Sequence, residues 1–186
     1  MRIVGGQWRG RHLATPKHSG LRPTSERVRE AVFDILAHGA QDFSYTGART
    51  IDLFAGTGAL GLEALSRGAA FCLFIDIDAH ARGLIRANIE ALGLGGITKV
   101  FRRDATQLGP AGNRGGYTLA VLDPPYGGGF GEKALLSLHH GQWLASGAVV
   151  VLEERADISC DLPPPFAPFD RRIYGDTQVL FGRFVP

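Results

Sequence analysis

The segment IDLFAGTGALG, residues 51–61, constrains the fold of this chain more than any other stretch. It places Gly56, Gly58 and Gly61 directly after a short apolar run and directly before a helical pattern. Glycines at this spacing allow a tight turn and let backbone N–H groups come close to a ligand. Asp76 follows Gly56 by 20 residues, where an acid usually binds the two hydroxyls of a ribose. The segment therefore predicts the first strand, loop and helix of a nucleotide-binding α/β sheet.

The rest of the chain repeats this alternation from residue 49 onward. The apolar runs cover residues 50–54, 71–75, 99–101, 119–122 and 148–152, and the helical stretches cover 60–67 and 79–92. Alternating runs of this kind are typical of a doubly wound, mostly parallel sheet. Two further strand-like stretches, residues 169–174 and 178–185, are joined by a Gly175–Asp176 turn. They predict an antiparallel hairpin at the end of the chain.

The first 40 residues form a different pattern. Residues 2–4 and 11–13 flank a glycine-containing turn, which predicts a short hairpin. Thr24 precedes the amphipathic pattern of residues 28–36 and is expected to cap that helix. We therefore expect an N-terminal extension over residues 1–40 and a larger domain over residues 41–186.

Positive charge is concentrated in the extension. The whole chain has a net charge of +2, but residues 1–30 contain seven Arg and Lys against two acids. A basic arm on a slightly acidic body is typical of contact with a polyanion, although solvated arginines on an exposed arm give the same pattern.

The composition fits a soluble globular protein, with 45% apolar and 20% charged residues in 186. No run approaches the roughly 18 apolar residues of a membrane span, and the N-terminus lacks the apolar stretch of a signal peptide. Cys72 and Cys160 lie far apart in the sequence. We expect free thiols in a reducing cytoplasm and no membrane partner.

Two acids favour S-adenosylmethionine over NAD, which the glycine loop and Asp76 alone would fit equally well. Asp52 lies inside the strand, four residues before Gly56, where a pyrophosphate would be repelled but the ammonium group of a methionine moiety would be tolerated. Asp104 follows the third apolar run and could accept the adenine N6 protons, with the Ala105 N–H alongside. A helix N-cap is the alternative role for Asp104.

The stretch VLDPPYGGGF, residues 121–130, ends a strand with a carboxylate followed by two prolines. Proline donates no hydrogen bond to a sheet, so the strand must stop at Asp123. Asp123 and the Pro124 carbonyl could accept hydrogen bonds from an exocyclic amine and direct its lone pair at a methyl group, while Tyr126 stacks on the base. Residues 127–129, all glycine, would form a mobile lip. The motif predicts methylation of a base amine, or sometimes of a glutamine, without choosing between adenine and guanine or between DNA and RNA.

Three other features are given structural interpretations. His139 and His140 are adjacent, so they face different directions on a helix, and a surface pair rather than a metal site is expected. Glu153 and Glu154 after the fifth strand are expected to form a solvated edge, and Asn88 is expected to bond locally.

The chain as a whole resembles the bacterial 16S ribosomal RNA guanine-N2 methyltransferases. The resemblance rests on residues 2–13, 21–36, 53–69, 123–126 and 172–177, in order and spacing, and it covers essentially the full length. It implies a Rossmann-like class I S-adenosylmethionine-dependent methyltransferase with a seven-stranded, mostly parallel sheet, an antiparallel C-terminal strand and an N-terminal hairpin and helix. It also implies a cytoplasmic monomer that needs no metal, produces S-adenosylhomocysteine and methylates N2 of one guanine on an assembled or partly assembled small subunit.

The resemblance also implies the site residues. The catalytic loop would be Asp123, Pro124, Pro125 and Tyr126. The cofactor would be lined by Asp52, Ala55, Gly56, Thr57, Gly58, Asp76, Ile77, Asp104 and Ala105. RNA would be bound by Arg9, Arg11, Arg22, Arg27 and Arg29, of which Arg29 is the one that could instead brace the fold through Glu30 and Asp34. Asp76 stands where many relatives carry Glu, which shortens its reach to the ribose.

Two alternatives to this function stay open on the sequence. An adenine-N6 DNA methyltransferase would use the same catalytic motif on another base. A non-catalytic RNA-binding assembly factor would keep the fold with a vestigial site, although the intact loop at residues 123–126 argues against it.

Overall fold

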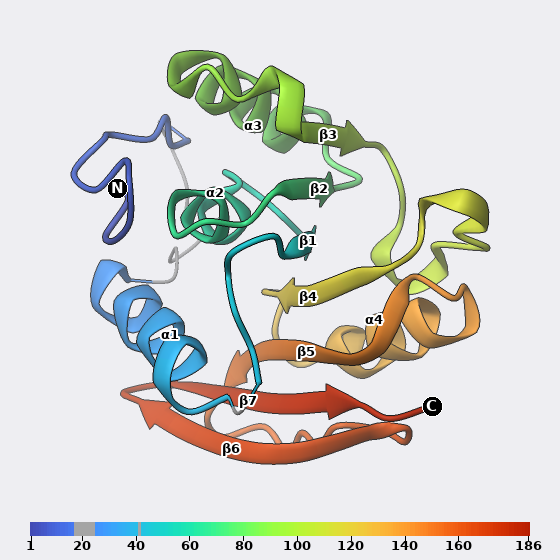
Figure 1. Ribbon diagram of the computed structural model, residues 1–186. Helices are drawn as coiled ribbons and strands as arrows, with labels where there is room; N and C mark the ends of the chain where they lie inside the picture. The colour runs from blue at the N-terminus through green and yellow to red at the C-terminus, as the bar shows by residue number, and fades with distance from the viewer. Residues whose placement is uncertain (17–24, 41) are drawn as a thin grey trace.

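Seven strands form a single sheet in the order β3-β2-β1-β4-β5-β7-β6 (Figure 1). The computed structural model describes residues 1–16, 25–40 and 42–186. The strands are β1 Arg49–Leu53, β2 Phe71–Ile75, β3 Thr98–Phe101, β4 Tyr117–Leu122, β5 Leu144–Arg155, β6 Phe166–Tyr174 and β7 Thr177–Phe184. Strands β1 to β5 pair in parallel, and β7 runs antiparallel to both β5 and β6. The predicted fold class, a mostly parallel Rossmann-like sheet with an antiparallel end, is confirmed.

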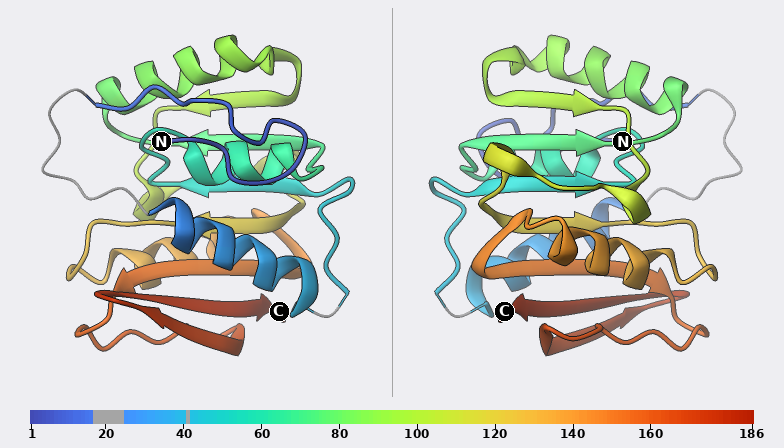
Figure 2. Two further views of the ribbon diagram at one scale, coloured as in Figure 1. Left: turned by 90° about the vertical axis from the view of Figure 1, so that its left-hand side faces the viewer. Right: turned by 90° about the vertical axis from the view of Figure 1, so that its right-hand side faces the viewer.

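Helices cover both faces of the sheet (Figure 2). The longer ones are α1 Glu26–His38, α2 Ala59–Ser66, α3 Ala79–Leu92 and α4 Phe130–His140, and the short 3-10 segments are Gly95–Ile97, Ala105–Gln107 and Gly112–Arg114. Helices α1, α2 and α3 lie on one face, and α4 lies on the other. None of the helices in the described part of the chain is both long enough and apolar enough to cross a bilayer.

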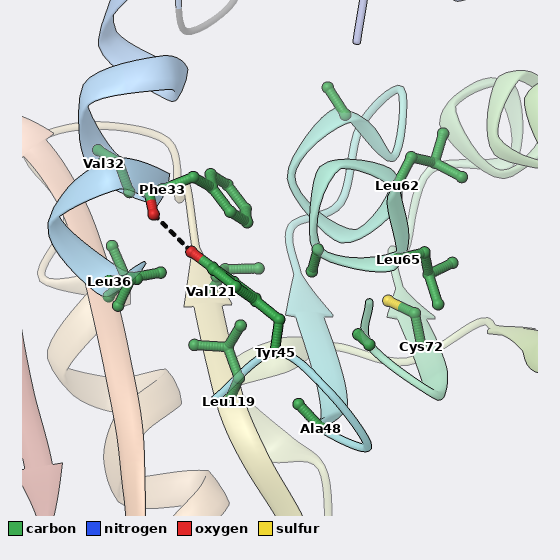
Figure 3. Close-up of a cluster of buried hydrophobic side chains, with 14 of the residues drawn as sticks. Val32, Phe33, Leu36, Tyr45, Ala48, Leu62, Leu65, Cys72, Leu119 and Val121 are labelled. Carbon is green, nitrogen blue, oxygen red and sulfur yellow. Dashed lines mark hydrogen bonds between the residues drawn. The ribbon is translucent and has the colours of Figure 1, made fainter. Parts of the chain in front are cut away.

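The sheet forms one hydrophobic cluster on each face because strand side chains alternate between the faces. Phe74 and Val121 point into the cluster with α1, α2 and α3, whereas their neighbours Ile75 and Leu122 point into the cluster with α4. In the first cluster, Phe33 of α1 lies beside Tyr45, whose hydroxyl donates a 2.7 Å hydrogen bond to the Phe33 carbonyl (Figure 3). The central strands β1, β2 and β4 and the second half of β5 are therefore buried on both faces, as their near-continuous apolar runs predict, whereas β6 at the edge is mostly exposed.

The helix ends follow ordinary capping chemistry. Helix α3 matches the predicted bounds and ends at Gly93, which takes the left-handed conformation with φ 71°. The cap predicted for α1 at Thr24 is wrong. The N-cap is Ser25, whose hydroxyl oxygen accepts from Val28 N at 3.2 Å, so the helix begins one residue later than expected. Thr24 itself lies outside the described residues.

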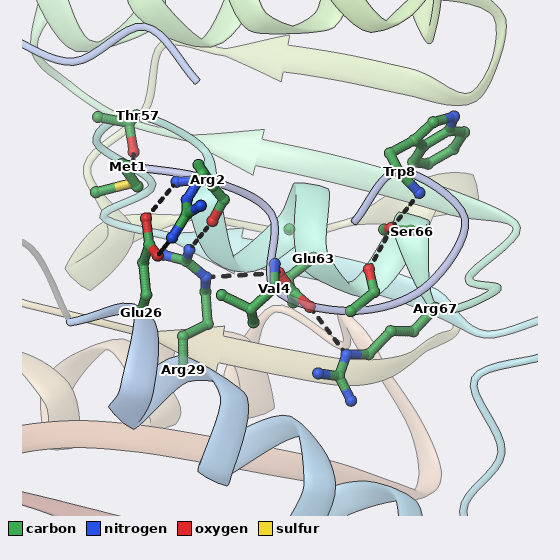
Figure 4. A network of polar contacts seen from close by, with 12 residues as sticks. Met1, Arg2, Val4, Trp8, Glu26, Arg29, Thr57, Glu63, Ser66 and Arg67 are labelled. Carbon is green, nitrogen blue, oxygen red and sulfur yellow. Dashed lines mark hydrogen bonds and ion pairs between the residues drawn. The ribbon is translucent and has the colours of Figure 1, made fainter. Parts of the chain in front are cut away.

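The N-terminal arm, residues 1–14, folds back on itself and lies over α2 (Figure 4). The predicted hairpin is reduced to one antiparallel bridge between Arg2 and His12. Ile3 and Leu13 are buried in the same cluster as α1 and α2. The arm is therefore packed into the core of the described chain.

Close backbone contact fixes the arm on α2. Gln7 N donates to the Ser66 carbonyl at 2.7 Å, and Trp8 N donates to the Ser66 hydroxyl at 2.9 Å. Gly6 has φ 74°, and a Cβ there would lie 1.9 Å from the Ser66 carbonyl oxygen, so only glycine fits. The domain boundary expected after residue 40 stays a prediction.

Candidate functional site

The strand register brings four sequence motifs to one edge of the sheet. Leu53, the last residue of β1, pairs with Ile75 of β2 on one side and with Leu122 of β4 on the other. Ile75 in turn pairs with Phe101 at the end of β3. The segments that follow these residues are the glycine loop, Asp76, Asp104 and Asp123, and they leave the sheet together. This edge is also where the strand order reverses between β1 and β4, the usual ligand position in an open α/β sheet.

The glycine loop uses its glycines for different purposes. Gly56 and Gly58 have φ values of 57° and 80°, in the left-handed region where other residues are strained. At Gly61 a Cβ would lie 2.5 Å from the Phe74 ring and 2.6 Å from the Cys72 sulfur, so this glycine lets α2 pack closely on β2. Phe54 also has a positive φ, 57°, although it is not a glycine. Strain of this kind is concentrated at functional sites, and no sequence pattern signals it.

Asp76 ties the end of β2 to the glycine loop. One carboxylate oxygen accepts from Gly56 N at 2.8 Å, and the other accepts from Asp78 N at 2.9 Å. Each oxygen of a carboxylate can accept a second hydrogen bond, so the predicted ribose contact fits this arrangement. Ile77 beside it is 62% exposed and presents an apolar surface at the same edge.

Asp52 lies behind the loop. Its side chain is 1% exposed, and one oxygen accepts from Gly61 N at 2.8 Å. Burial raises the pKa of Asp52 well above its usual value, the Gly61 N–H opposes that rise, and the nearby charges of Asp123 and Asp76 add to it. Asp52 is therefore held behind the loop through Gly61, near the start of α2, and its contact with a cofactor stays a prediction.

Asp104 takes the capping role that was its alternative. One carboxylate oxygen accepts from Thr106 N at 2.8 Å and from the Thr106 hydroxyl at 2.7 Å, at the start of the segment Ala105–Gln107. Ala105 is buried in the hydrophobic cluster on the α4 face. The contact of Asp104 with adenine stays a prediction.

The DPPY loop begins where β4 ends, as predicted. Asp123 is half-buried, Pro124 is buried, and Pro125 is exposed. Tyr126 is 41% exposed, and its hydroxyl donates to a Glu153 carboxylate oxygen at 2.9 Å. Burial raises the pKa of Tyr126, and the charges of Glu153 and Asp123 raise it further. The tyrosine is thus anchored at its hydroxyl end while much of its surface remains accessible.

The prediction that Glu153 and Glu154 form a solvated edge is wrong. They are 5% and 2% exposed, because β5 continues through both of them to Arg155 and pairs with β7 along this length. Glu154 accepts from Gly127 N at 3.3 Å and from Arg155 N at 2.8 Å. The apolar run predicted a strand that ends at Leu152, so the two glutamates were expected to lie beyond it. The groups that bury them belong to β7 and to the loop after β4, which are distant in sequence.

Asn88 also differs from its prediction, since its partners are distant in sequence. Its side-chain nitrogen donates to the Thr57 carbonyl at 2.9 Å and to the Ala14 carbonyl at 3.2 Å. Its oxygen accepts from Ala14 N at 2.6 Å. Asn88 therefore links the glycine loop to the N-terminal arm.

The five predicted RNA-contacting arginines separate into different environments. Arg9, Arg11 and Arg27 are exposed, and Arg22 lies outside the described residues. Arg11 also donates to the Ala91 carbonyl at 3.0 Å, which holds it against the end of α3.

RNA contact by Arg29 is wrong, because its side chain is fully buried. The alternative, that Arg29 braces the fold, is what the structure shows, but through other partners than Glu30 and Asp34. Its guanidinium lies 3.5 Å from the Glu63 carboxylate and donates to the Arg2 carbonyl (Figure 4). Burial lowers the pKa of Arg29, and Glu63 opposes that change.

The carboxyl edge gathers acidic side chains, of which buried Asp52 has a raised pKa while Asp123 and Asp76 contribute negative charge. Asp52, Asp76 and Asp123 lie close enough for the charges of the latter two to affect the pKa of Asp52. A group of carboxylates on a glycine loop favours a cationic ligand, and the sulfonium of S-adenosylmethionine is such a cation. In the described residues no group of three or more His, Cys, Asp and Glu is arranged to hold a metal ion.

Comparison with known proteins identifies relatives along nearly the whole chain. Residues 1–183 match the family described as Conserved hypothetical protein 95. Ribosomal RNA small subunit methyltransferase D of Escherichia coli K12 is 38% identical over 157 residues, which cover 84% of this chain and 76% of that protein. The putative rRNA methyltransferase YlbH of Bacillus subtilis is 32% identical over 160 residues, covering 85% of this chain and 84% of YlbH. The solved structure of the putative methyltransferase yhhF from Escherichia coli superimposes with a TM-score of 0.82 at 30% identity, covering 100% of this chain and 98% of that one.

Proposed function

Since the chain belongs to the Conserved hypothetical protein 95 family, we propose that it transfers a methyl group from S-adenosylmethionine to the exocyclic N2 of a guanine in 16S ribosomal RNA. S-adenosylhomocysteine would be the second product. The observation that carries the proposal is the pairing of Leu53 with Leu122, which brings the glycine loop and Asp123 to adjacent positions at the carboxyl edge.

The cofactor would be held by residues that already meet there. The left-handed backbone at Gly56 and Gly58 gives close access to the loop, Asp76 is set to accept from ribose hydroxyls, and exposed Ile77 offers an apolar surface to the adenine. When bound, S-adenosylmethionine supplies an electrophilic methyl group on a positively charged sulfur. The acids of this edge would favour that charge over the neutral product and so assist product release.

The DPPY loop would bind the target base. The Asp123 carboxylate and the Pro124 carbonyl would accept from the exocyclic NH₂, which turns the nitrogen lone pair toward the methyl group. Catalysis would then consist mainly of positioning, which is worth up to about 7–11 kcal/mol in favourable cases. Tyr126, 41% exposed, would stack on the base; such stacking contributes about 1–3 kcal/mol.

The arm would bind the RNA backbone. Arg9 and Arg11 of the arm are exposed, as is Arg27 of α1, and all three contribute positive charge to the N-terminal segment. They would supply affinity that is independent of sequence and is weakened by salt. The proposal extends to a cytoplasmic monomer acting on the assembled or partly assembled small subunit, with residues 1–40 as the RNA-contacting extension.

A methyl-transfer assay tests the proposal. The purified protein would be incubated with radiolabelled S-adenosylmethionine and small-subunit particles from cells that lack it, and with naked 16S RNA and duplex DNA in parallel. Digestion to nucleosides should show N2-methylguanosine, formed fastest on particles. Transfer only to adenine in duplex DNA would establish the alternative enzyme. Binding of RNA without transfer or cofactor binding would indicate an assembly factor.

A further inference from the structure

We propose that Glu153 is a positioning residue for methyl transfer: it fixes the Tyr126 ring, and Glu154 fixes the next loop residue. The inference rests on the proposed function, because the ring is taken as the surface on which the target base stacks. Its basis is a side-chain contact from a neighbouring strand that no sequence pattern predicts.

The register sets Glu153 beside the catalytic loop. Leu122 pairs with Leu152, so Glu153 occupies on β5 the place that Asp123 occupies on β4. Glu153 is 5% exposed, whereas Tyr126 is 41% exposed. The buried carboxylate thus holds a partly exposed ring through its hydroxyl, at 2.9 Å.

The chemistry of the contact makes it strong. A hydroxyl that donates to a carboxylate forms a charge-assisted bond, roughly twice as strong as a neutral one. The raised pKa of Tyr126 keeps its proton in place at neutral pH, so the hydroxyl remains a donor. A ring that is held at Cβ and at its hydroxyl is fixed before a base arrives, which lowers the ordering cost of stacking.

Glu154 supplies a second attachment one residue further along the loop. Its carboxylate accepts from Gly127 N at 3.3 Å, at the start of the glycine lip. Gly127 has φ 81°, so this conformation suits glycine. Two consecutive residues of β5 therefore hold two consecutive residues of the loop, one through a side chain and one through the backbone.

The test is a set of variants measured with small-subunit particles and S-adenosylmethionine. Glu153→Ala and Tyr126→Phe each remove the hydrogen bond between Tyr126 and Glu153, from opposite sides, and Tyr126→Phe also removes the hydroxyl that Thr177 contacts. Each should lower kcat/KM for the particle about tenfold, within the usual range for a hydrogen bond to a charged group. The Kd for S-adenosylmethionine should stay within about twofold, and Glu153→Gln, which keeps an acceptor, should recover most of the activity.

The double variant and a control complete the design. Glu153→Ala with Tyr126→Phe should lose clearly less than the product of the two single losses, because both changes remove the hydrogen bond between Tyr126 and Glu153. Tyr45→Phe removes a buried tyrosine hydroxyl bond on the α1 face and should leave the kinetics unchanged. If Glu153→Ala destabilises the protein, Tyr126→Phe and Glu153→Gln still test the contact.

Hydrogen exchange separates this inference from the proposed function. Exchange in the peptide over residues 124–130 should become about tenfold faster in Glu153→Ala and Tyr126→Phe but not in Tyr45→Phe, following the local opening that such contacts oppose. Absence of transfer by the unaltered protein would refute the proposed function alone. The role of Glu153 would be overturned if Glu153→Ala and Tyr126→Phe left the exchange rate or kcat/KM unchanged. It would also be overturned if the losses of the two single variants multiplied in the double variant, or if the affinity for S-adenosylmethionine fell as much as kcat/KM.

Discussion

Two regions of this molecule bury charged side chains, and they treat the charge in opposite ways. Under the N-terminal arm, Glu63 is contacted by Arg67 at 2.9 Å and by Arg29 at 3.5 Å, so its negative charge is balanced by cations (Figure 4). At the carboxyl edge, Asp52 and Asp76 are held by the backbone N–H groups of Gly61 and Gly56.

The difference teaches which charges serve the fold and which are available for a ligand. The arm network joins three segments: Glu63 also accepts from Val4 N at 2.9 Å, and the three charged groups bind the arm, α1 and α2 together. Within it, Nε and Nη1 of Arg29 are buried without a hydrogen-bond partner among the described residues. At the carboxyl edge, backbone N–H groups, which carry no full charge, orient Asp52 and Asp76. The first region should therefore respond to mutation mainly in stability, and the second mainly in activity.

Arg29→Ala should break the arm network with the largest effect, about 3–5 kcal/mol of unfolding free energy, because it leaves Glu63 buried with less compensation. Urea unfolding followed by circular dichroism would measure it. Arg9→Ala is the matched control at an exposed position and should change stability by less than about 0.5 kcal/mol. A loss below about 1 kcal/mol for Arg29→Ala would show that this ion-pair network is not what holds the arm.

Asp123→Ala should have the largest effect at the carboxyl edge, on activity and not on stability. Transfer should fall by about 10²–10³-fold, the usual result of removing one group that stabilises the transition state. Unfolding free energy and the Kd for S-adenosylmethionine should change little, because Asp123 lies at the end of β4 and the glycine loop is held by other groups. Single-turnover methylation and calorimetry would measure the two. Near-normal turnover would rule out the proposed part of Asp123 in binding the amine.

Asn88→Ala tests whether the two regions are coupled. The side chain joins the Thr57 carbonyl of the glycine loop to both backbone groups of Ala14. Its removal leaves buried polar groups unsatisfied, at about 1–3 kcal/mol of stability, and should also weaken cofactor binding several-fold.

Asn113 in the segment Gly112–Arg114 is exposed, so Asn113→Ala is the matched control and should change neither quantity. If Asn88→Ala loses stability but keeps its affinity for S-adenosylmethionine, the contact between the arm and the glycine loop stabilises the fold without influencing cofactor binding.

The sequence predicted the parts of both regions that depend on local patterns. Apolar alternation and turn residues located the strands, and the glycine spacing located the loop, because each of these is decided within a few residues. Arg29 was missed as a buried residue because its partner Glu63 lies 34 positions away, inside an otherwise apolar helix. The buried face of α1 is also centred nearer Phe33 than its apolar pattern suggested.

Glu153 and Glu154 were missed for the same reason. Their burial depends on β7, the second strand of the C-terminal hairpin, which pairs with β5. It also depends on the loop after β4, which contacts both glutamates. Long-range partners of charged residues leave no periodic signal, so the sequence predicted that these motifs lie at one edge of the sheet but not the contacts that hold them.

The smallest expected effect concerns arginines of the same N-terminal segment that the fold does not bury. Arg9 and Arg11 are exposed, so Arg9→Ala with Arg11→Ala should leave the fold intact and reduce the salt dependence of RNA binding. For every phosphate group that the variant no longer binds, the slope of log K against log salt should fall by about 0.7–0.9. Fluorescence binding to 16S RNA at several salt concentrations would measure it.

The control for this pair removes two positive charges from β6 instead. Arg171 and Arg172 of that strand are exposed and paired with Asp161 and Asp170, respectively. Arg171→Ala with Arg172→Ala should leave the slope nearly unchanged, because surface ion pairs already compensate these arginines. Equal changes in both double variants would mean that RNA senses net charge alone. An unchanged slope for the Arg9 and Arg11 variant would mean that the arm serves the fold and does not bind RNA. Arg11, which also donates to the Ala91 carbonyl at the end of α3, would then be structural like Arg29, although it is exposed and Arg29 is buried.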